Sequence, residues 1–283
     1  MPIGVQHTRF ATIRARLEAY QPRPGWRVWL FEFLLFGFKQ GWACLFGALM
    51  LAILLGTHLW YPADAPIARY DAITLCAIII QAAMLLFKLE TWEEARVILT
   101  FHIVGTMMEL FKTAMGSWAY PEASFLHIGA VPLFSGFMYA SVGSYLARVW
   151  RIFDFQFNHF PTRGWLITIA LGIYINFFTH HWITDLRWLM FALVVWQFWG
   201  CNVAFKPFRT RHQMPLLLGF LLVALFIWFA ENIGTYANAW AYPNQRDGWA
   251  PVGITKLGSW YLLMIISFIL VALLHRKGTP HTR

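Results

Sequence analysis

"ELFKTAMGSWAYP" at residues 109–121 recurs, with changes, as "ENIGTYANAWAYP" at residues 231–243. Each copy begins with a glutamate that ends an apolar run, and each finishes with Trp-Ala-Tyr-Pro at the same distance. A shift of 122 residues superposes the copies without a gap, and it also places "THLW" (57–60) on "THHW" (179–182). Unrelated segments would match in about one column of fifteen. The agreement therefore predicts an internal duplication, with chance recurrence of aromatic membrane-interface motifs as the alternative.

The composition is that of a helical membrane protein. Of the 283 residues, 59% are hydrophobic and 12% are charged, and the mean hydropathy is +0.54. Apolar runs of about 20 residues, the length of a membrane-spanning helix, recur along the whole chain. We therefore predict an all-α bundle of eight transmembrane helices. The predicted spans lie near residues 40–60, 70–88, 95–114, 127–149, 164–181, 183–204, 214–233 and 253–275.

The distribution of basic residues predicts an orientation. With the N-terminus inside, most Lys and Arg residues fall on inner loops, which favours an even number of spans and two cytoplasmic termini in a bacterial cytoplasmic (inner) membrane. Because these residues lie in loops, the net charge of +9 does not indicate nucleic-acid binding. Residues 8–20 read as a basic helix on the membrane surface, and residues 26–38 as an interfacial helix or an extension of the first span.

The predicted duplication divides the chain into two transmembrane halves. An even number of spans in each half makes the repeats parallel, related by a pseudo-two-fold axis along the membrane normal. The predicted parts are a cytoplasmic or interfacial segment (1–39), the first repeat (40–150), a cytoplasmic linker (151–163), the second repeat (164–277) and a cytoplasmic tail (278–283).

On this topology the repeated motifs lie at the outer face of the cytoplasmic membrane, so we expect one site or two related half-sites there. Glu109 and Glu231 each end a strongly apolar helix, and a carboxylic acid in an apolar cavity can protonate an alkene or activate a water. We predict these two glutamates as acid and base, with His58 and His180 as proton relays. The structural alternative is an ion pair of Glu109 with Lys112, three residues along the helix.

The other residues of the motifs are candidates for binding a substrate or a metal. The aromatic side chains would line or cover the cavity, or would form an aromatic belt at the membrane interface. The predicted substrate-binding residues are Trp118, Tyr120, Trp240, Tyr242, Thr113 and Thr235. Imidazole and carboxylate together suit Zn or Fe, so the site holds either a divalent metal or no cofactor. The metal-ligand candidates are His58, His180, His181 and Asp185.

Nearly the full length resembles an uncharacterised bacterial integral-membrane family, domain of unknown function 817. The segments that carry this resemblance are "ELFKTAMGSWAYPEA", "NHFPTRGW", "FKPFRTRHQMPLLLG", "FAENIGTYANAWAYPNQ" and "KLGSWYLLMIISF".

A local stretch, residues 109–133, is similar to carotenoid hydratases of the bisanhydrobacterioruberin type. The sequence departs from their pattern with Lys112 where a glycine is expected and with a second full motif copy. This similarity implies acid–base chemistry on a long apolar polyene or isoprenoid that enters from the lipid. The matching residues are Glu109, Gly116, Trp118, Tyr120, Gly129, Val131, Pro132 and Leu133.

These observations favour a membrane enzyme acting on a lipid-soluble molecule, an isoprenoid or another lipid, by hydration- or cyclisation-like chemistry or with a metal. Its expected partners are membrane lipid or a lipid-soluble small molecule, and a homo-oligomer is compatible with the pattern. The alternatives are a proton-coupled transporter with parallel repeats and a structural or accessory membrane subunit.

Overall fold

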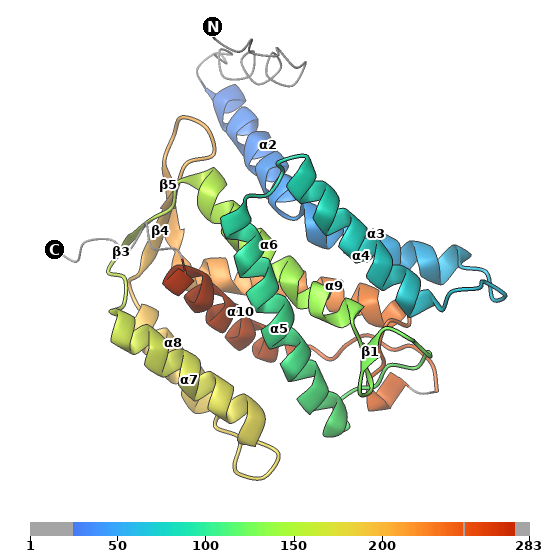
Figure 1. Ribbon diagram of the computed structural model, residues 1–283. Helices are drawn as coiled ribbons and strands as arrows, with labels where there is room; N and C mark the ends of the chain where they lie inside the picture. The colour runs from blue at the N-terminus through green and yellow to red at the C-terminus, as the bar shows by residue number, and fades with distance from the viewer. Residues whose placement is uncertain (1–24, 246, 275–283) are drawn as a thin grey trace, which may run out of the picture.

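The computed structural model describes residues 25–245 and 247–274, so the predicted surface helix at 8–20 and the tail at 278–283 lie outside the described residues. The described part is mostly helical and forms nine α-helices, which Figure 1 shows as a tilted bundle. They are α2 (Trp26–Ala43), α3 (Leu45–Trp60), α4 (Arg69–Leu86), α5 (Trp92–Ala114), α6 (Phe134–Phe153), α7 (Arg163–Thr179), α8 (Arg187–Phe198), α9 (Leu216–Tyr236) and α10 (Thr255–Leu274).

The described residues are mostly helical, as predicted, and they also form short strands that were not predicted. Two antiparallel sheets, β1–β2 and β3–β4–β5, lie at opposite ends of the bundle, and a 3-10 turn, η1, follows the second motif (Figure 1). Because β1–β2 precedes α6 and β4 follows α8, the predicted spans at 127–149 and 183–204 are shorter as helices than expected. The bounds are β1 (His127–Ile128), β2 (Val131–Pro132), β3 (Gln156–Asn158), β4 (Asn202–Phe205), β5 (His212–Pro215) and η1 (Pro243–Gln245).

The structure supports several membrane-spanning helices but not the predicted eight. Within the described residues, α4, α5, α9 and α10 are long and apolar enough to cross a membrane. The pair α2–α3 qualifies as a fifth span, bent by 65°. With 17 and 12 residues, α7 and α8 are shorter than a typical span. Serines, glycines and two arginines lower the hydropathy of α6. Eight spans are therefore not confirmed, although α3 to α10 overlap the predicted segments.

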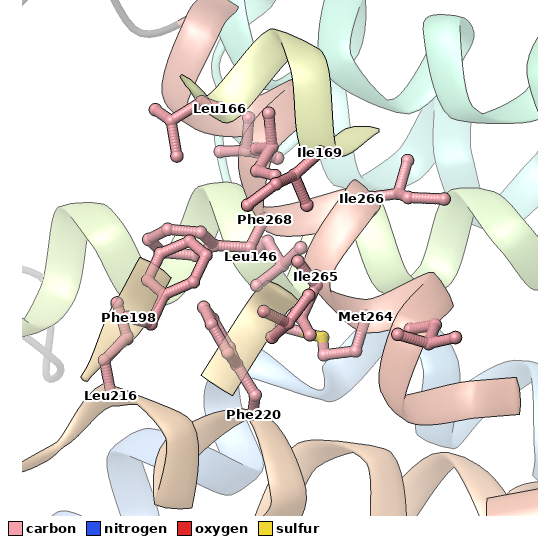
Figure 2. Close-up of a cluster of buried hydrophobic side chains, with 14 of the residues drawn as sticks. Leu146, Leu166, Ile169, Phe198, Leu216, Phe220, Met264, Ile265, Ile266 and Phe268 are labelled. Atoms are coloured by element: carbon pink, nitrogen blue, oxygen red, sulfur yellow. The ribbon is translucent and has the colours of Figure 1, made fainter. Parts of the chain in front are cut away.

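A large apolar cluster holds the second half of the chain against α6. Figure 2 shows Leu146 of α6 among side chains from α7, α8, α9 and α10. Phe220 and Phe268 meet edge to face with ring centroids 4.9 Å apart, and Ile265 is fully buried. Such packing is the main stabilising contribution available to apolar side chains in a helical bundle.

Buried charges hold the other half at the end that carries β3–β5, which we call the sheet end. The guanidinium of Arg148 on α6 is fully buried and donates to Glu90 Oε1 at 2.9 Å. Ser144 and Gln81 donate to the same carboxylate at 2.6 Å. Arg148 also donates to the carbonyl of Trp42 at 3.0 Å, where α2 ends and the chain bends. One arginine therefore neutralises a buried carboxylate and donates to a carbonyl at a helix end.

Removing this arginine is expected to destabilise the bundle. Arg148→Met leaves Glu90 charged and unpaired in the interior, which should lower the free energy of unfolding by about 3–5 kcal/mol. Unfolding in detergent micelles, followed by circular dichroism, measures the change. The exposed Arg96→Met variant on α5 is the control and should change stability by about 0.5 kcal/mol or less. Equal stability of Arg148→Met and Arg96→Met would contradict this role.

Candidate functional site

The two motif copies form the end of the bundle opposite to the sheet end, which we call the motif end. Here α5 and α9 terminate in the same way: the next residue but one is left-handed, Gly116 with φ 67° and Asn238 with φ 54°. The following amides, of Ser117 and Ala239, each donate to the carbonyl five residues earlier at 3.0 Å. This helix-ending turn sends both Trp-Ala-Tyr-Pro segments back over the last turn of their helices.

Glu109 accepts hydrogen bonds on both of its oxygens. Trp118 Nε1 and the hydroxyl of Tyr120 donate to Oε2 at 2.7 and 2.6 Å, and the hydroxyl of Tyr139 on α6 donates to Oε1 at 2.8 Å. The side chain is only 5% exposed. The sequence spacing of glutamate, tryptophan and tyrosine is therefore the same in both copies because the turn must bring both donors onto one carboxylate.

Glu231 is bound in a similar way but has one oxygen free. Trp240 Nε1 and the hydroxyl of Tyr242 both donate to Oε1, at 3.0 and 2.5 Å. Tyr261, which matches Tyr139 at the 122-residue shift, instead points its hydroxyl at the carbonyl of Leu217 at 3.4 Å. In the part of the chain that the structure describes, Oε2 of Glu231 therefore receives no hydrogen bond.

The two copies pair with each other. Ala119 N donates to Ala241 O at 3.0 Å, and Ala241 N donates to Ala119 O at 2.9 Å. The ring of Trp118 meets the ring of Tyr242 edge to face at 6.1 Å, and the charge of Glu109 acts on Glu231. The motif end therefore brings the two predicted glutamates and their aromatic partners into one buried unit.

The tyrosines of the motif are permanent donors. Burial, together with the neighbouring carboxylates of Glu109 and Glu231, raises the pKa of Tyr120 and of Tyr242 well above the usual range. Neither phenol loses its proton at a physiological pH, so the carboxylates keep these partners.

Lys112 does not pair with Glu109, the structural alternative raised by their spacing. Its ammonium lies 2.9 Å from His181 Nε2 and 3.4 Å from His180 Nε2, and 4.2 Å from the ring centre of Phe177. His180 Nδ1 lies 3.0 Å from the carbonyls of Asn176 and Phe177. A carbonyl can only accept, so Nδ1 carries the proton and the lone pair of Nε2 faces Lys112.

His58 lies in a different place from His180. It lines a surface cavity of about 360 Å³ with Thr57, Tyr61, Arg69 and Glu122. The centre of its ring is 5.5 Å from that of Tyr236. His58 and His180, which match at the 122-residue shift, therefore have different surroundings.

The metal candidates do not assemble. Within the described ranges no three His, Cys, Asp or Glu side chains converge in a way that would hold an ion. Lys112 lies against the Nε2 atoms of His180 and His181, and Asp185 Oδ1 accepts from Asn176 at 3.1 Å and from the backbone amide of Arg187 at 2.9 Å. This donor set does not fit a metal.

Thr113 and Thr235 make local hydrogen bonds. Thr113 Oγ1 donates to the carbonyl of Glu109 at 2.7 Å within α5. Thr235 Oγ1 lies 3.2 Å from the carbonyl of Asn232 and 3.2 Å from Trp249 Nε1. Both hydroxyls are therefore engaged in hydrogen bonds to their own helix or to a neighbouring loop.

Two charged groups that hold the motif end were not predicted from the sequence. Asp71 on α4 accepts from the backbone amides of Phe125 and Leu126 at 2.9 and 2.8 Å, and so fixes the loop that follows the first motif. Arg69 pairs with Glu122 and donates to the carbonyl of Ala237, where α9 ends. A charged residue at the start of an apolar run is the signal that identifies them, since such residues need partners.

The long apolar helices of the described residues indicate the class: a helical membrane protein. Residues 32–268 match the family described as "Protein of unknown function (DUF817)", and the chain belongs to this family. A curated relative, "Uncharacterized protein YoaT" of Bacillus subtilis (strain 168), is 44% identical over 237 residues, which cover 84% of this chain and 89% of the relative. No solved structure matches. The similarity to carotenoid hydratases is not shown by these comparisons.

Loss of the third donor to Glu109 should cost stability. Tyr139→Phe removes the hydrogen bond to Oε1 and leaves a buried carboxylate oxygen without a donor, which should cost about 1–3 kcal/mol of unfolding free energy. Tyr261→Phe is the matched control, because its hydroxyl makes only a 3.4 Å contact, and it should change stability little. Chemical unfolding in detergent measures both variants, and a larger loss for Tyr261→Phe would refute the assignment.

Acid should weaken the contact between the α7–α8 turn and α5. Burial, Lys112 and His180 lower the pKa of His181 below its usual value of about 6.5. Below that value His181 binds a proton in the unfolded chain but not yet in the folded chain. The free energy of unfolding therefore falls as the pH is lowered from 7 to 5. Thermal unfolding across this range should show a smaller decline in His181→Gln. Equal slopes in wild type and His181→Gln would exclude the effect.

Proposed function

We propose that the chain is a multi-pass enzyme of the bacterial cytoplasmic membrane that carries out acid–base chemistry on a lipid-soluble substrate at the motif end. The observation that carries this proposal is the difference between the two glutamates. Oε2 of Glu231 has no hydrogen-bond partner among the described residues, whereas both oxygens of Glu109 accept hydrogen bonds.

Glu231 is the better candidate for the acid–base group. A general acid or base must hold a free lone pair or a proton in a fixed direction, and the two donors on Oε1 fix the carboxylate of Glu231 while its Oε2 stays available. At Oε2 it can give a proton to an alkene or take one from a water. Glu109, with three donors, is better suited to hold the first motif loop.

The proposal includes an internal duplication. Equivalent helices pack on equivalent partners: α3 on α4 as α7 on α8, α5 on α6 as α9 on α10, and α3 on α6 as α7 on α10. Ala119 and Ala241 are 122 positions apart and bond to each other reciprocally, which is the pattern expected at a pseudo-two-fold axis. On this proposal the second copy carries the chemistry and the first copy supplies its support.

Transport has less support. A transporter needs polar groups along a path between the two ends, and the space between α6, α9 and α10 is filled by apolar side chains such as Leu146, Ile265 and Phe268 (Figure 2). Glu90 at the sheet end is engaged with Arg148, Ser144 and Gln81.

The decisive experiment compares Glu231→Gln with wild type in host cells that lack the endogenous relative. Lipid and pigment extracts are analysed by mass spectrometry. We expect a lipid species whose amount depends on the wild-type chain, and a fall in its rate of conversion by about 100-fold or more in Glu231→Gln.

Glu93→Gln is the matched control, because Glu93 is exposed at the sheet end and the chemical change is the same. It should behave as wild type. Extracts that are identical in the presence and absence of the wild-type chain, or full conversion by a folded Glu231→Gln protein, would refute the enzyme.

A further inference from the structure

Three cationic side chains lie at the motif end, where Lys112 contacts His180 and His181 of the turn before Arg187, and Lys256 lies 5.9 Å from the ring centre of Trp118. Lys112 comes from α5, Arg187 from the start of α8 and Lys256 from the start of α10. In the ranges that the structure describes, no carboxylate oxygen lies within ion-pair distance of either lysine. Arg187 pairs with Asp185 at 3.2 Å, and that carboxylate is shared with Asn176.

More cations than anions surround Lys112. Lys256 and Arg187 are the neighbouring cations, and Asp185 is the neighbouring anion. Lys112 is 4% exposed, and Lys256 lies 4.3 Å from the ring centre of Tyr242, so neither ammonium is fully hydrated. Like charges held together away from water are costly unless an anion balances them.

Two helix N-termini add to this positive field. Arg187 is the first residue of α8 and Lys256 is the second residue of α10, and neither first turn contains an acidic residue. A helix N-terminus carries a partial positive charge that favours anions and disfavours lysine or arginine. Cations at this position are therefore unfavourable by themselves and become favourable when an anion binds among them.

An apolar groove begins beside these cations. Trp188, the neighbour of Arg187, starts a surface groove of about 750 Å³ that runs along α8. Its other lining residues are Phe191, Ala192, Val195, Trp196 and Trp199. Phe191 contacts Tyr261 of α10 with ring centres 5.9 Å apart, so the groove lies against the same helix that carries Lys256.

We infer that Lys112, Arg187 and Lys256 bind the anionic head group, of the phosphate class, of an amphiphilic molecule whose apolar tail lies along α8. Lys256 and Arg187, the more exposed cations, receive the head group, and Lys112 lies beneath them with its two imidazole partners. The inference rests on the proposed function and specifies its substrate class, because Lys256 lies against the ring of Tyr242, whose hydroxyl donates to Glu231.

Binding of dodecyl phosphate to the purified full-length chain in dodecyl maltoside tests the inference by isothermal titration calorimetry. Lys256→Gln should weaken binding about tenfold or more, because one charge-assisted contact is lost. Lys206→Gln is the matched control: it also removes one positive charge, but Lys206 is exposed in the β4–β5 loop at the sheet end. An unchanged dissociation constant for Lys256→Gln, or an equal loss in Lys206→Gln, would overturn the site.

Further arms separate the sources of the anion and the two proposals. If inorganic phosphate competes with dodecyl phosphate, the site recognises the anion alone. If inorganic phosphate does not compete but phosphatidylglycerol does, the site recognises a lipid head group; either result supports an anion site at these cations.

Glu231→Gln should bind dodecyl phosphate as well as wild type or better, even where conversion of the lipid is lost. If Glu231→Gln keeps full activity while Lys256→Gln loses binding, the proposed function fails and the anion site stands. Lys112→Arg, which keeps the charge, should retain binding and Lys112→Gln should weaken it; unchanged binding by a folded Lys112→Gln protein would remove Lys112 from the site.

Discussion

The motif end depends on one interaction, a buried carboxylate that accepts the indole and phenol protons of its own loop. Glu109 and Glu231 lie in the last turns of α5 and α9, where an unpaired carboxylate would be costly. Each is matched by a tryptophan and a tyrosine that the helix-ending turn returns to it. The backbone of the two loops is then free to pair through Ala119 and Ala241. A contact that is local in each copy thus joins the halves of the molecule.

The glutamates of the two motif copies differ in their hydrogen bonds because of one hydroxyl. Tyr139 reaches Glu109, and Tyr261, at the equivalent position, turns to a backbone carbonyl. Together with Gly234 in the place of Lys112, this difference leaves the second carboxylate with a free oxygen and the first half with the buried ammonium. The proposed chemistry therefore combines an acid–base group from α9 with cations from α5, α8 and α10, and neither half contains the whole site.

The sequence was informative where the determinants are local. The spacing of glutamate, tryptophan and tyrosine and the apolar runs both have short-range causes. The saturation of Glu109 was not predictable, since Tyr139 and Tyr261 match in sequence and differ only in how α6 and α10 pack. The strands were not predictable either, because β3 pairs with a segment 44 residues further along the chain at Asn158 and Asn202. From the sequence, Arg148 is one of the basic residues assigned to inner loops. Its pairing with the distant Glu90 could not be predicted.

The reciprocal Ala119–Ala241 pairing has a consequence for how such a chain is made and how it arose. During synthesis, Ala119 is made before Ala241. Until the second loop has been synthesised, the backbone N–H and C=O groups of Ala119 therefore lack this partner. On the proposed duplication, a single-unit ancestor would have met the same need with a second copy of itself. The present protein would then be a fused homodimer, in which fusion allowed one unit to specialise while the other kept its architectural task.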